Sequence, residues 1–537
     1  MPISFDSIPA QWRMPLFWAE VDPSMAGLPI VRDPILLVGA MIADPTDTTI
    51  YPTPDPALPA GVVPGIAVPN IPKPIGTQAQ ADREYGMGSE LASMFAACVA
   101  NNFAHETWCL PLAPLAGSEA STGTITITAP ATEAGMIHLY VAGHHVGIAI
   151  GTTDTLNDIA TQLAAAINAD PKLPVVAVAA AAPAATVTLT AKTRGDNGDD
   201  ITVQLNFYGK IGGQELPPGC QIDLPATGRL SGGGGVPDCT VAISNLGEHA
   251  YEYVALPYTD SNTLFDWEQE FGFEDIGRWG WMRQLYGVIF CAKRGEYTDL
   301  MLWGDPITGA TPNFGPLTVM GVEETAASPT YEWCAAYCAK AARALTNDPA
   351  RPLQTLKLNK ILPCQREDSF ILPELNNLSG VGIATQKIGS DGQPMVMRDT
   401  TTYQLNLYGQ SDDAYELVTT MSTLARIIRN QRQVITSKFP RHKLANDGTR
   451  FGVGQKIVTP KIVKAELVSQ YRIDEFNGLV EDVASFKDHL IVERDPNNPN
   501  RLNVLWPPDL VNQLRVYAVL VQFRLQYNRG QDLEVIR

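Results

Sequence analysis

The chain has 537 residues of ordinary globular composition, and 39 Lys and Arg against 57 Asp and Glu give it a net charge of −18. This length predicts roughly three or four domains with real hydrophobic cores. The N-terminus lacks a secretory signal pattern, no apolar run approaches the roughly 20 residues of a membrane span, and the eight cysteines are scattered. We therefore expect a protein with reduced thiols that stays in the cytosol where it is made.

The first 28 residues predict an extended N-terminal arm rather than a domain, because Ile3 and Phe5 alternate with polar neighbours and prolines interrupt any helix. Residues 29–116 predict the first part of an α/β domain. Its expected elements are a buried strand at Ile35–Ala40, a proline-rich surface loop from Asp44 to Pro74, a helix at Ser89–Phe103 and a strand at Trp108–Leu112.

Residues 117–208 predict an inserted, independent β-rich domain, because short β-branched runs separated by turns begin here. The expected elements are strands at Thr124–Thr128, His138–Val141, Val146–Ile150, Thr186–Lys192 and Ile201–Phe207, and a helix at Leu156–Asn168. Residues 209–240 predict a Gly-rich linker. Its run Gly232–Gly235 has no side chains to pack, so we expect it to be mobile.

Residues 241–410 predict the second part of the α/β domain, because strands and helices alternate and this alternation favours a parallel sheet covered by helices. The expected strands are Tyr251–Leu256, Val288–Ala292 and Leu317–Val322, with helices at Leu264–Leu285, near Leu300 and at Pro329–Leu345. Ser328 is the expected N-cap of the last helix, with Pro329 at its first position. Cys334 and Cys338, at helical spacing, are expected to be buried rather than to bind a metal.

Residues 411–537 predict a C-terminal α+β domain in which the charge changes sign. From Met421 onward eighteen Lys and Arg stand against twelve Asp and Glu, so the first 420 residues carry −24 and the rest +6. A helix at Tyr415–Arg432 is expected to turn Leu417, Met421, Leu424 and Ile428 toward a core and Arg426, Arg429 and Arg432 away from it. Those cations indicate either a solvated face or a binding surface for an acidic partner.

The end of the chain carries two short extended segments. Val521, Phe523, Leu525 and Tyr527 alternate with polar residues, and Leu533–Ile536 follows a turn. Neither segment has an obvious partner nearby in the sequence. Because such strands pair with another sheet, both ends of the chain are candidates for pairing across subunits.

No pattern of catalytic or cofactor chemistry occurs in the sequence. It contains no phosphate-binding glycine loop, no nucleophile elbow, no zinc-protease motif and no Cys-x-x-Cys pair. The adjacent His144 and His145 fall in a predicted hairpin, where they should point to opposite faces. We therefore expect no enzyme activity, no catalytic or metal site and no cofactor. The net charge of −18 and the scarcity of interleaved aromatics also disfavour nucleic-acid binding.

Several stretches, taken in order, resemble the contractile tail sheath proteins of Mu-like bacteriophages. These stretches are Ile3–Pro9, Glu20–Ser24, Pro349–Leu353, Arg398–Gln404, Thr423–Arg429, Val458–Pro460, Asn500–Leu502 and Pro508–Gln513. The resemblance covers nearly the whole chain. It implies a multidomain α/β and α+β fold with exchanged terminal strands. It also implies a subunit of stacked six-fold rings around a tail tube, assembled in the host cytoplasm and carried in the virion.

The same resemblance implies that the sheath contracts and drives the tube through the host envelope, using energy stored in its interfaces. It implies a tail tube protein, a baseplate and a tail terminator as partners, and no direct insertion into a membrane. The predicted inter-subunit mesh comprises Ile3, Phe5, Ile8, Val521, Phe523, Leu525, Leu533 and Val535. The predicted tube-facing cations are Arg426, Arg429, Arg432, Lys438, Arg441 and Lys443.

Two other classes of protein remain open from the residues alone. An enzyme or carbohydrate-binding protein on an α/β scaffold predicts a real pocket and a monodisperse particle. A passive adhesin or surface-layer subunit shares the self-assembly but lacks two lattice states.

Overall fold

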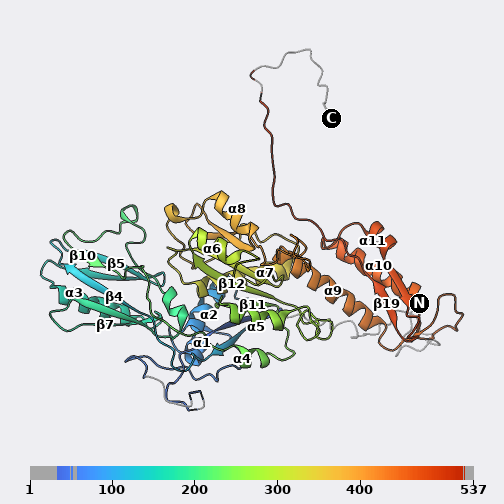
Figure 1. The fold of residues 1–537 in the computed structure, drawn as a ribbon, viewed down its shortest axis with the longest axis horizontal. Coiled ribbons are helices and arrows are strands. Elements are labelled where there is room, and N and C mark those ends of the chain that lie inside the picture. Colours follow the sequence, from blue (N-terminus) through green and yellow to red (C-terminus); the bar gives the residue numbers. More distant parts are fainter. Residues whose placement is uncertain (1–32, 49, 52–56, 524, 526–537) are drawn as a thin grey trace, which may run out of the picture.

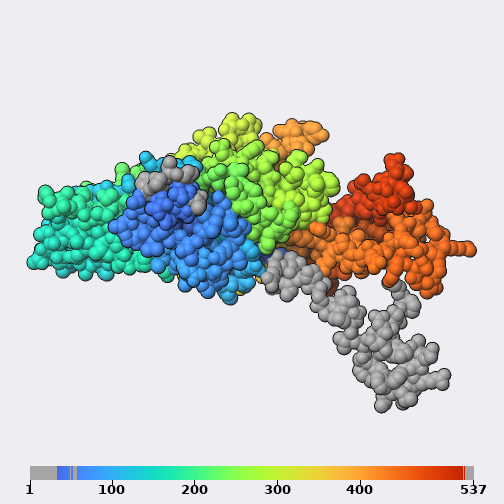
Figure 2. Space-filling view, turned by 90° about the horizontal axis from the view of Figure 1, so that it is seen from below, coloured from blue at the N-terminus to red at the C-terminus, as the bar shows by residue number. Residues whose placement is uncertain are grey.

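The computed structural model describes residues 33–48, 50–51, 57–523 and 525. Within them the protein is elongated, with three bodies in a row (Figure 1). The inserted β-rich body lies at one end, the α/β domain in the middle and the C-terminal domain at the other end, an order that Figure 2 shows from below. The predicted arm at residues 1–28 lies outside the described residues.

In the described residues, the α/β domain is built on an eight-stranded sheet in the order β15-β14-β13-β12-β11-β1-β3-β2. Its strands are β1 (Ile35–Ala40), β2 (Lys73–Pro74), β3 (Thr107–Leu112), β11 (Tyr253–Ala255), β12 (Val288–Gly295), β13 (Leu317–Glu323), β14 (Ile383–Ile388) and β15 (Pro394–Arg398). The six inner strands are parallel, and only the edge strands β2 and β15 are antiparallel. The predicted parallel sheet is confirmed, including the two strands that precede the insertion.

Helices cover both faces of this sheet, because its central strands are apolar on both sides. They are α1 (Gln78–Tyr85), α2 (Glu90–Asn101), α4 (Thr240–Ser244), α5 (Ser261–Phe271), α6 (Tyr297–Gly304), α7 (Thr330–Asn347) and α8 (Leu372–Gly380). In β1, Ile35 and Leu37 join the core beneath α2 and α7, whereas Leu36 and Val38 join the core beneath α4 and α5. The result is a three-layer α/β/α domain.

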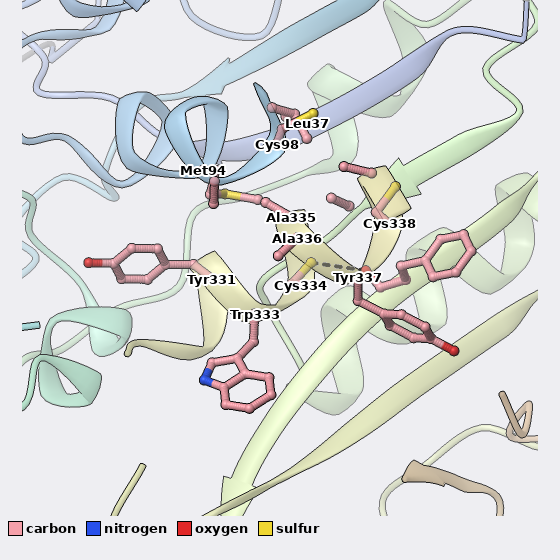
Figure 3. Packing of buried hydrophobic residues seen from close by; sticks show 14 of the residues in the cluster. Leu37, Met94, Cys98, Tyr331, Trp333, Cys334, Ala335, Ala336, Tyr337 and Cys338 are labelled. Atoms are coloured by element: carbon pink, nitrogen blue, oxygen red, sulfur yellow. Dashed lines mark hydrogen bonds between the residues drawn. The ribbon is translucent and has the colours of Figure 1, made fainter. Parts of the chain in front are cut away.

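Helix α7 is buried almost all round, as Figure 3 shows. Its alanines let α2 pack closely beside it. Cys334 and Cys338 are fully buried, as predicted, and the Cys334 thiol donates to the Phe290 carbonyl over 3.1 Å. The predicted cap is wrong by one residue, since Pro329 is the N-cap and the Ser328 hydroxyl instead accepts from the Leu362 amide over 3.0 Å.

The predicted helix at Leu264–Leu285 is also wrong, because α5 ends at Phe271. Turns and bends occupy residues 272–283, where glycines interrupt the apolar pattern, and irregular chain follows up to β12. At Gly287, whose φ is +121°, a Cβ atom would lie 2.5 Å from the Tyr251 carbonyl oxygen. This glycine therefore permits the close approach that begins β12.

The inserted body has its own core, formed between two sheets and one helix. The sheets have the orders β10-β4-β8-β7 and β6-β5-β9. The elements are β4 (Thr122–Ala129), β5 (Gly135–Val141), β6 (His144–Ile150), α3 (Leu156–Ala169), β7 (Val175–Ala179), β8 (Thr186–Ala191), β9 (Val203–Leu205) and β10 (Gln221–Asp223). A complete capping box between Thr155 and Asp158 begins α3.

The Gly-rich segment is not the mobile linker that we expected, because it completes the inserted body. Strand β10 pairs with β4, and Ser231 exchanges two 2.9 Å backbone hydrogen bonds with Thr122. The Gly233 amide donates to the Asp199 carboxylate over 2.8 Å. A Cβ atom at Gly233 would lie 2.3 Å from the Ser121 hydroxyl, so glycine here permits close packing rather than motion.

The C-terminal domain contains α9 (Val418–Lys438), β16 (Lys443–Leu444), β17 (Ile457–Val458), α10 (Pro460–Phe476), α11 (Val483–His489), β18 (Ile491–Arg494) and β19 (Leu502–Leu505). Helix α9 is longer than predicted and belongs to two cores. Val418 and Met421 are buried in the α/β core, whereas Ile427 is buried in the C-terminal core. Of the four residues predicted to face a core, only Met421 is fully buried.

Candidate assembly surfaces

In the described part of the α/β domain, the position where such folds usually bind ligands is filled by a side chain. In an open parallel sheet that position is the carboxyl edge where the strand order reverses, which here lies between β1 and β11. The Glu90 carboxylate fills it, accepting from the Ala40 amide over 3.3 Å and from the Asn197 side chain over 3.2 Å. The two cavities that remain beside Glu90 have volumes of about 10 Å³ each, enough for one water molecule.

Asn197 belongs to the inserted body, which therefore closes this edge of the sheet. Burial raises the pKa of Glu90 to about 7, against the opposing effect of the Asn197 amide. Arg294 is almost fully buried and forms an ion pair with Asp200 of the insertion. The Arg294 guanidinium also donates to the Ala326 and Ser328 carbonyls over 2.6 and 2.9 Å. The insertion is thus docked on the sheet by buried polar contacts.

The two adjacent histidines point to different partners, as the hairpin predicts. His144 lies 3.6 Å from the Glu332 carboxylate of α7, and this contact raises the His144 pKa. His145 contacts His138 across the hairpin at 2.9 Å. Within the described ranges, no group of three or more His, Cys, Asp or Glu could hold a metal ion, and no helix is long and apolar enough to cross a membrane.

The first half of α9 turns its cations toward the α/β domain, not toward solvent. Arg429 forms an ion pair with Glu252, donates to the Leu285 carbonyl over 2.9 Å and lies over the Tyr286 ring at 5.1 Å. Arg426 lies 3.4 Å from the Asp33 carboxylate. The prediction that these two arginines lie outside the protein is wrong, because the opposite face of the helix meets another domain.

The second half of α9 and the residues after it carry cations that are exposed. Arg432 and Arg441 are exposed. Lys438, half exposed, pairs with Glu466, and the exposed Lys443 donates to the Gln455 side chain over 2.9 Å. Four of the six cations predicted to face a partner are therefore on the outside of this domain.

An unusual feature of the C-terminal domain is the two-stranded sheet β18–β19. Its four residue pairs run from Ile491 opposite Leu505 to Arg494 opposite Leu502. Helix α10 packs against it, while the Ile491 and Leu505 side chains remain 51% and 60% exposed. Among the described residues neither outer edge pairs with another strand. Such edges are ready to accept a further strand.

After β19 the chain crosses from one domain to the other. The Asp509 carbonyl accepts from the Glu481 amide over 2.9 Å in the C-terminal domain. The Gln513 side chain then donates to the Ala350 carbonyl over 2.7 Å in the α/β domain. We name residues 509–515 the strap. Sequence reasoning missed it, although the Pro508–Gln513 stretch had stood out as a shared pattern.

The strap ends in a buried ion pair. Arg515 lies 2.7 Å from Asp399, and their side chains are 10% and 0% exposed. An arginine placed just before an apolar extended run, and an aspartate within Arg398–Gln404, were the only signals of this pair in the sequence.

Beyond Arg515 the chain leaves the molecule as an extended arm (Figure 1). The described residues after Arg515 form no strand, and their apolar side chains are exposed. The predicted mesh residues Val521, Phe523 and Leu525 are 75%, 80% and 97% exposed. The other predicted mesh residues, which are Ile3, Phe5, Ile8, Leu533 and Val535, lie outside the described residues.

Two phage sheath domains are recognised in the sequence, a phage tail sheath protein central domain at residues 232–402 and a phage tail sheath C-terminal domain at 410–524. The Mu-like prophage FluMu tail sheath protein of Haemophilus influenzae is 37% identical over 527 residues, which is 98% of this chain and 100% of that protein. The chain belongs to the phage tail sheath protein family. This sheath protein is therefore a structural subunit and not an enzyme.

Solved structures also resemble the sheath protein, at much lower sequence identity. The sheath tail protein Lin1278 of Listeria innocua is 10% identical, with a TM-score of 0.44 over 90% of this chain and 92% of that chain. The helical sheath of the anti-feeding prophage in its contracted state is 9% identical, with a TM-score of 0.41 over 96% and 99%.

Proposed function

We propose that this sheath protein polymerises as stacked six-fold rings around a tail tube and contracts to drive the tube through the host cell envelope. The observation that carries the proposal is that the described residues contain both an exposed, apolar C-terminal arm and a two-stranded sheet whose outer edges pair with no described strand. The relative in Haemophilus influenzae is named as the tail sheath protein of a Mu-like prophage, which supports a virion location. In this proposal the subunits assemble in the host cytoplasm and the sheath is part of the virion.

The arm of one subunit adds a strand to the β18–β19 sheet of another. An arm in the same chain is carried away from this sheet by the strap, which ends in the α/β domain at Arg515. In an added strand, Val521 and Phe523 lie on one side and Gln522 on the other. The apolar side packs beside Ile491 and Leu505, while the backbone ladder supplies hydrogen bonds.

The N-terminal mesh residues Ile3, Phe5 and Ile8 and the final segment with Leu533 and Val535 serve the same mesh. Main-chain ladders hold subunits together while the arms bend, so the lattice changes shape without dissociating. The driving free energy resides in the interfaces between subunits. A baseplate starts the contraction, and a terminator caps the far end of the sheath.

The tube-facing surface comprises Arg432, Lys438, Arg441 and Lys443, whereas Arg426 and Arg429 are withdrawn from it because they hold two domains together. Each exposed contact contributes about 1 kcal/mol or less, so contraction releases the contacts together without a large barrier. An acidic tube surface is the partner that this charge requires.

Deletion of residues 516–537 tests the mesh. We expect a folded monomer that no longer forms tubular polymers with the tail tube protein in negative-stain electron microscopy. A point variant, Phe523→Ser, is expected to weaken polymerisation, whereas the matched control Gln522→Ser on the opposite side should not. Normal striated tubes from the truncated protein contradict the arm assignment. Failure of the intact protein to form tubes with its own tail tube contradicts the sheath proposal itself.

The tube contact is tested separately with Arg432→Glu combined with Arg441→Glu. We expect polymers of sheath alone to persist while binding to preformed tail tubes falls, with a steep dependence on salt. Unchanged co-sedimentation with tubes at low salt contradicts the assignment of these cations.

A further inference from the structure

The turns that replace the predicted end of α5 form a rigid loop, Gly272–Tyr286, which we name the Trp281 loop. Its scaffold is the fully buried Arg278, whose guanidinium pairs with Glu270 at 2.7 Å and donates to the His249 carbonyl over 2.7 Å. Arg283 also pairs with Glu270, at 2.9 Å. Because both arginines are held by buried partners, the loop has one defined shape.

This rigid loop turns large apolar side chains outward. Ile276, Trp281 and Met282 are 77%, 68% and 61% exposed. The Trp281 indole is itself fixed, since its N–H donates to the Asp275 carboxylate over 2.6 Å. Tryptophan and methionine are enriched at the centre of protein interfaces. Because these side chains are already held in one geometry, they lose little conformational entropy when a partner binds. Among the described residues, none of these three side chains belongs to a hydrophobic core of the same chain.

The charge around these side chains is negative. Glu274 and Asp275 are exposed beside Trp281. The two arginines of the loop pair with two carboxylates, because Arg278 and Arg283 share Glu270 and Arg283 also pairs with Glu248 at 3.3 Å. A partner for this surface must therefore present apolar side chains together with cations.

The sheath protein itself carries a surface of that chemistry, at residues 449–456 between β16 and β17, which we name the basic tip. Arg450 and Lys456 are exposed, and the segment contains no acidic residue. Between them Phe451 and Val453 are 44% and 96% exposed. The basic tip thus offers two cations and two apolar side chains on a short loop.

The two surfaces belong to different parts of one molecule. The Trp281 loop contacts α9 at Arg429, through the Leu285 carbonyl. The basic tip lies beyond the other end of α9, which continues for nine residues past Arg429, or about 14 Å at 1.5 Å per residue. Among the described residues no hydrogen bond or ion pair joins the two surfaces within one chain, so their complementary chemistry points to a contact between two copies.

We propose that the Trp281 loop of one sheath subunit binds the basic tip of a neighbouring subunit. This inference rests on the proposed polymer. Two different, complementary surfaces form a heterologous contact, which generates rings or helical arrays rather than closed dimers. The contact adds a charge-steered apolar interface to the strand mesh. The residues proposed to contact the tube remain Arg432, Lys438, Arg441 and Lys443.

Charge reversal tests the contact in the intact protein. Glu274→Lys and Arg450→Glu are each expected to raise the critical concentration for polymerisation about fivefold, as measured by light scattering and electron microscopy. The double variant restores the wild-type value, because the two reversed charges again attract. Glu133→Lys, an exposed acidic position in the insertion, is the matched control and should leave the value unchanged.

A disulfide trap identifies the partner. All eight native cysteines are buried, so new surface cysteines react selectively. Mixing a Glu274→Cys variant with an Arg450→Cys variant should give a covalent dimer that neither variant gives alone, and the double-cysteine chain should give ladders of higher oligomers. A double-cysteine chain that stays monomeric and intramolecularly linked overturns the proposal.

The outcomes separate this contact from the sheath proposal. Polymerisation that is unchanged in both single variants, or not restored in the double variant, overturns the loop–tip contact and leaves the sheath intact. An Arg450→Glu variant that loses tail tube binding but polymerises normally assigns the basic tip to the tube and likewise overturns it. Absence of polymers from the wild-type chain in the presence of its tube overturns both.

Discussion

Replacing Arg429 with alanine should loosen the junction between the α/β and C-terminal domains. The variant loses the ion pair with Glu252, the hydrogen bond to the Leu285 carbonyl and the contact with the Tyr286 ring. It also leaves Glu252, whose side chain is only 9% exposed, without its cation. Breaking a fully buried pair costs about 3 to 5 kcal/mol. Because Arg429 is 21% exposed and solvent screens part of the effect, we expect about 2 to 3 kcal/mol here.

Urea unfolding of the monomer and hydrogen exchange within α9 measure this loss. Arg432→Ala is the matched control, because Arg432 lies three residues further along the same helix and is exposed. That substitution should change stability by less than about 0.5 kcal/mol. A double-mutant cycle with Glu252→Gln isolates the pairwise contribution. Equal unfolding midpoints and exchange rates for Arg429→Ala and Arg432→Ala would refute the reasoning that Arg429 is an internal clamp.

Three further perturbations follow from buried groups. Burial raises the Glu90 pKa from 4.5 to about 7, so its contribution to stability is complete below about pH 4.5 and is lost as the pH rises through about 7, on the order of 3 kcal/mol. In a series of urea midpoints at different pH, the Glu90→Gln variant should not show this loss. A variant whose midpoints depend on pH as steeply as those of the wild type contradicts the assignment to Glu90. Arg515→Ala leaves Asp399 buried without its cation, so limited proteolysis should cut the strap sooner than in Arg501→Ala, an exposed control. Gly287→Ala forces a Cβ atom against the Tyr251 carbonyl and should lower the melting temperature, whereas Gly380→Ala, with open space around it, should not.

The sequence predicts much of the α/β domain because its elements are defined by local patterns. The predicted bounds of the strand Ile35–Ala40 match β1, since six apolar residues buried on both sheet faces leave little ambiguity. Helix α3 is likewise marked by its capping box. No local pattern indicates which distant residues a segment pairs with. The partners of the Gly-rich segment, Thr122 and Asp199, lie more than thirty residues upstream, so its glycines indicate only flexibility.

The arginines of α9 likewise depend on contacts with residues that are distant in the sequence. Helical periodicity separates Arg426 and Arg429 from the apolar face of α9, but it does not tell whether their face meets solvent or another domain. The structure places Asp33 and Glu252 opposite them, and these residues are far away in the sequence. Arg432 has the same spacing and lies outside the junction. Sequence alone therefore predicts the cations of α9 but not which of them are available to a partner.

The contacts between the domains bear on how a sheath subunit could move. Helix α9 belongs to the cores of both the α/β and C-terminal domains, and the strap joins the same two domains a second time. The insertion is docked on the sheet by the buried pair of Arg294 and Asp200. Rotation between any two of these bodies must break buried ion pairs, each of which costs about 2 kcal/mol or more. The C-terminal arm beyond Arg515 has no such contacts in the described residues. Contraction as proposed therefore turns whole subunits as rigid bodies, and bending begins where the chain leaves the Arg515–Asp399 pair.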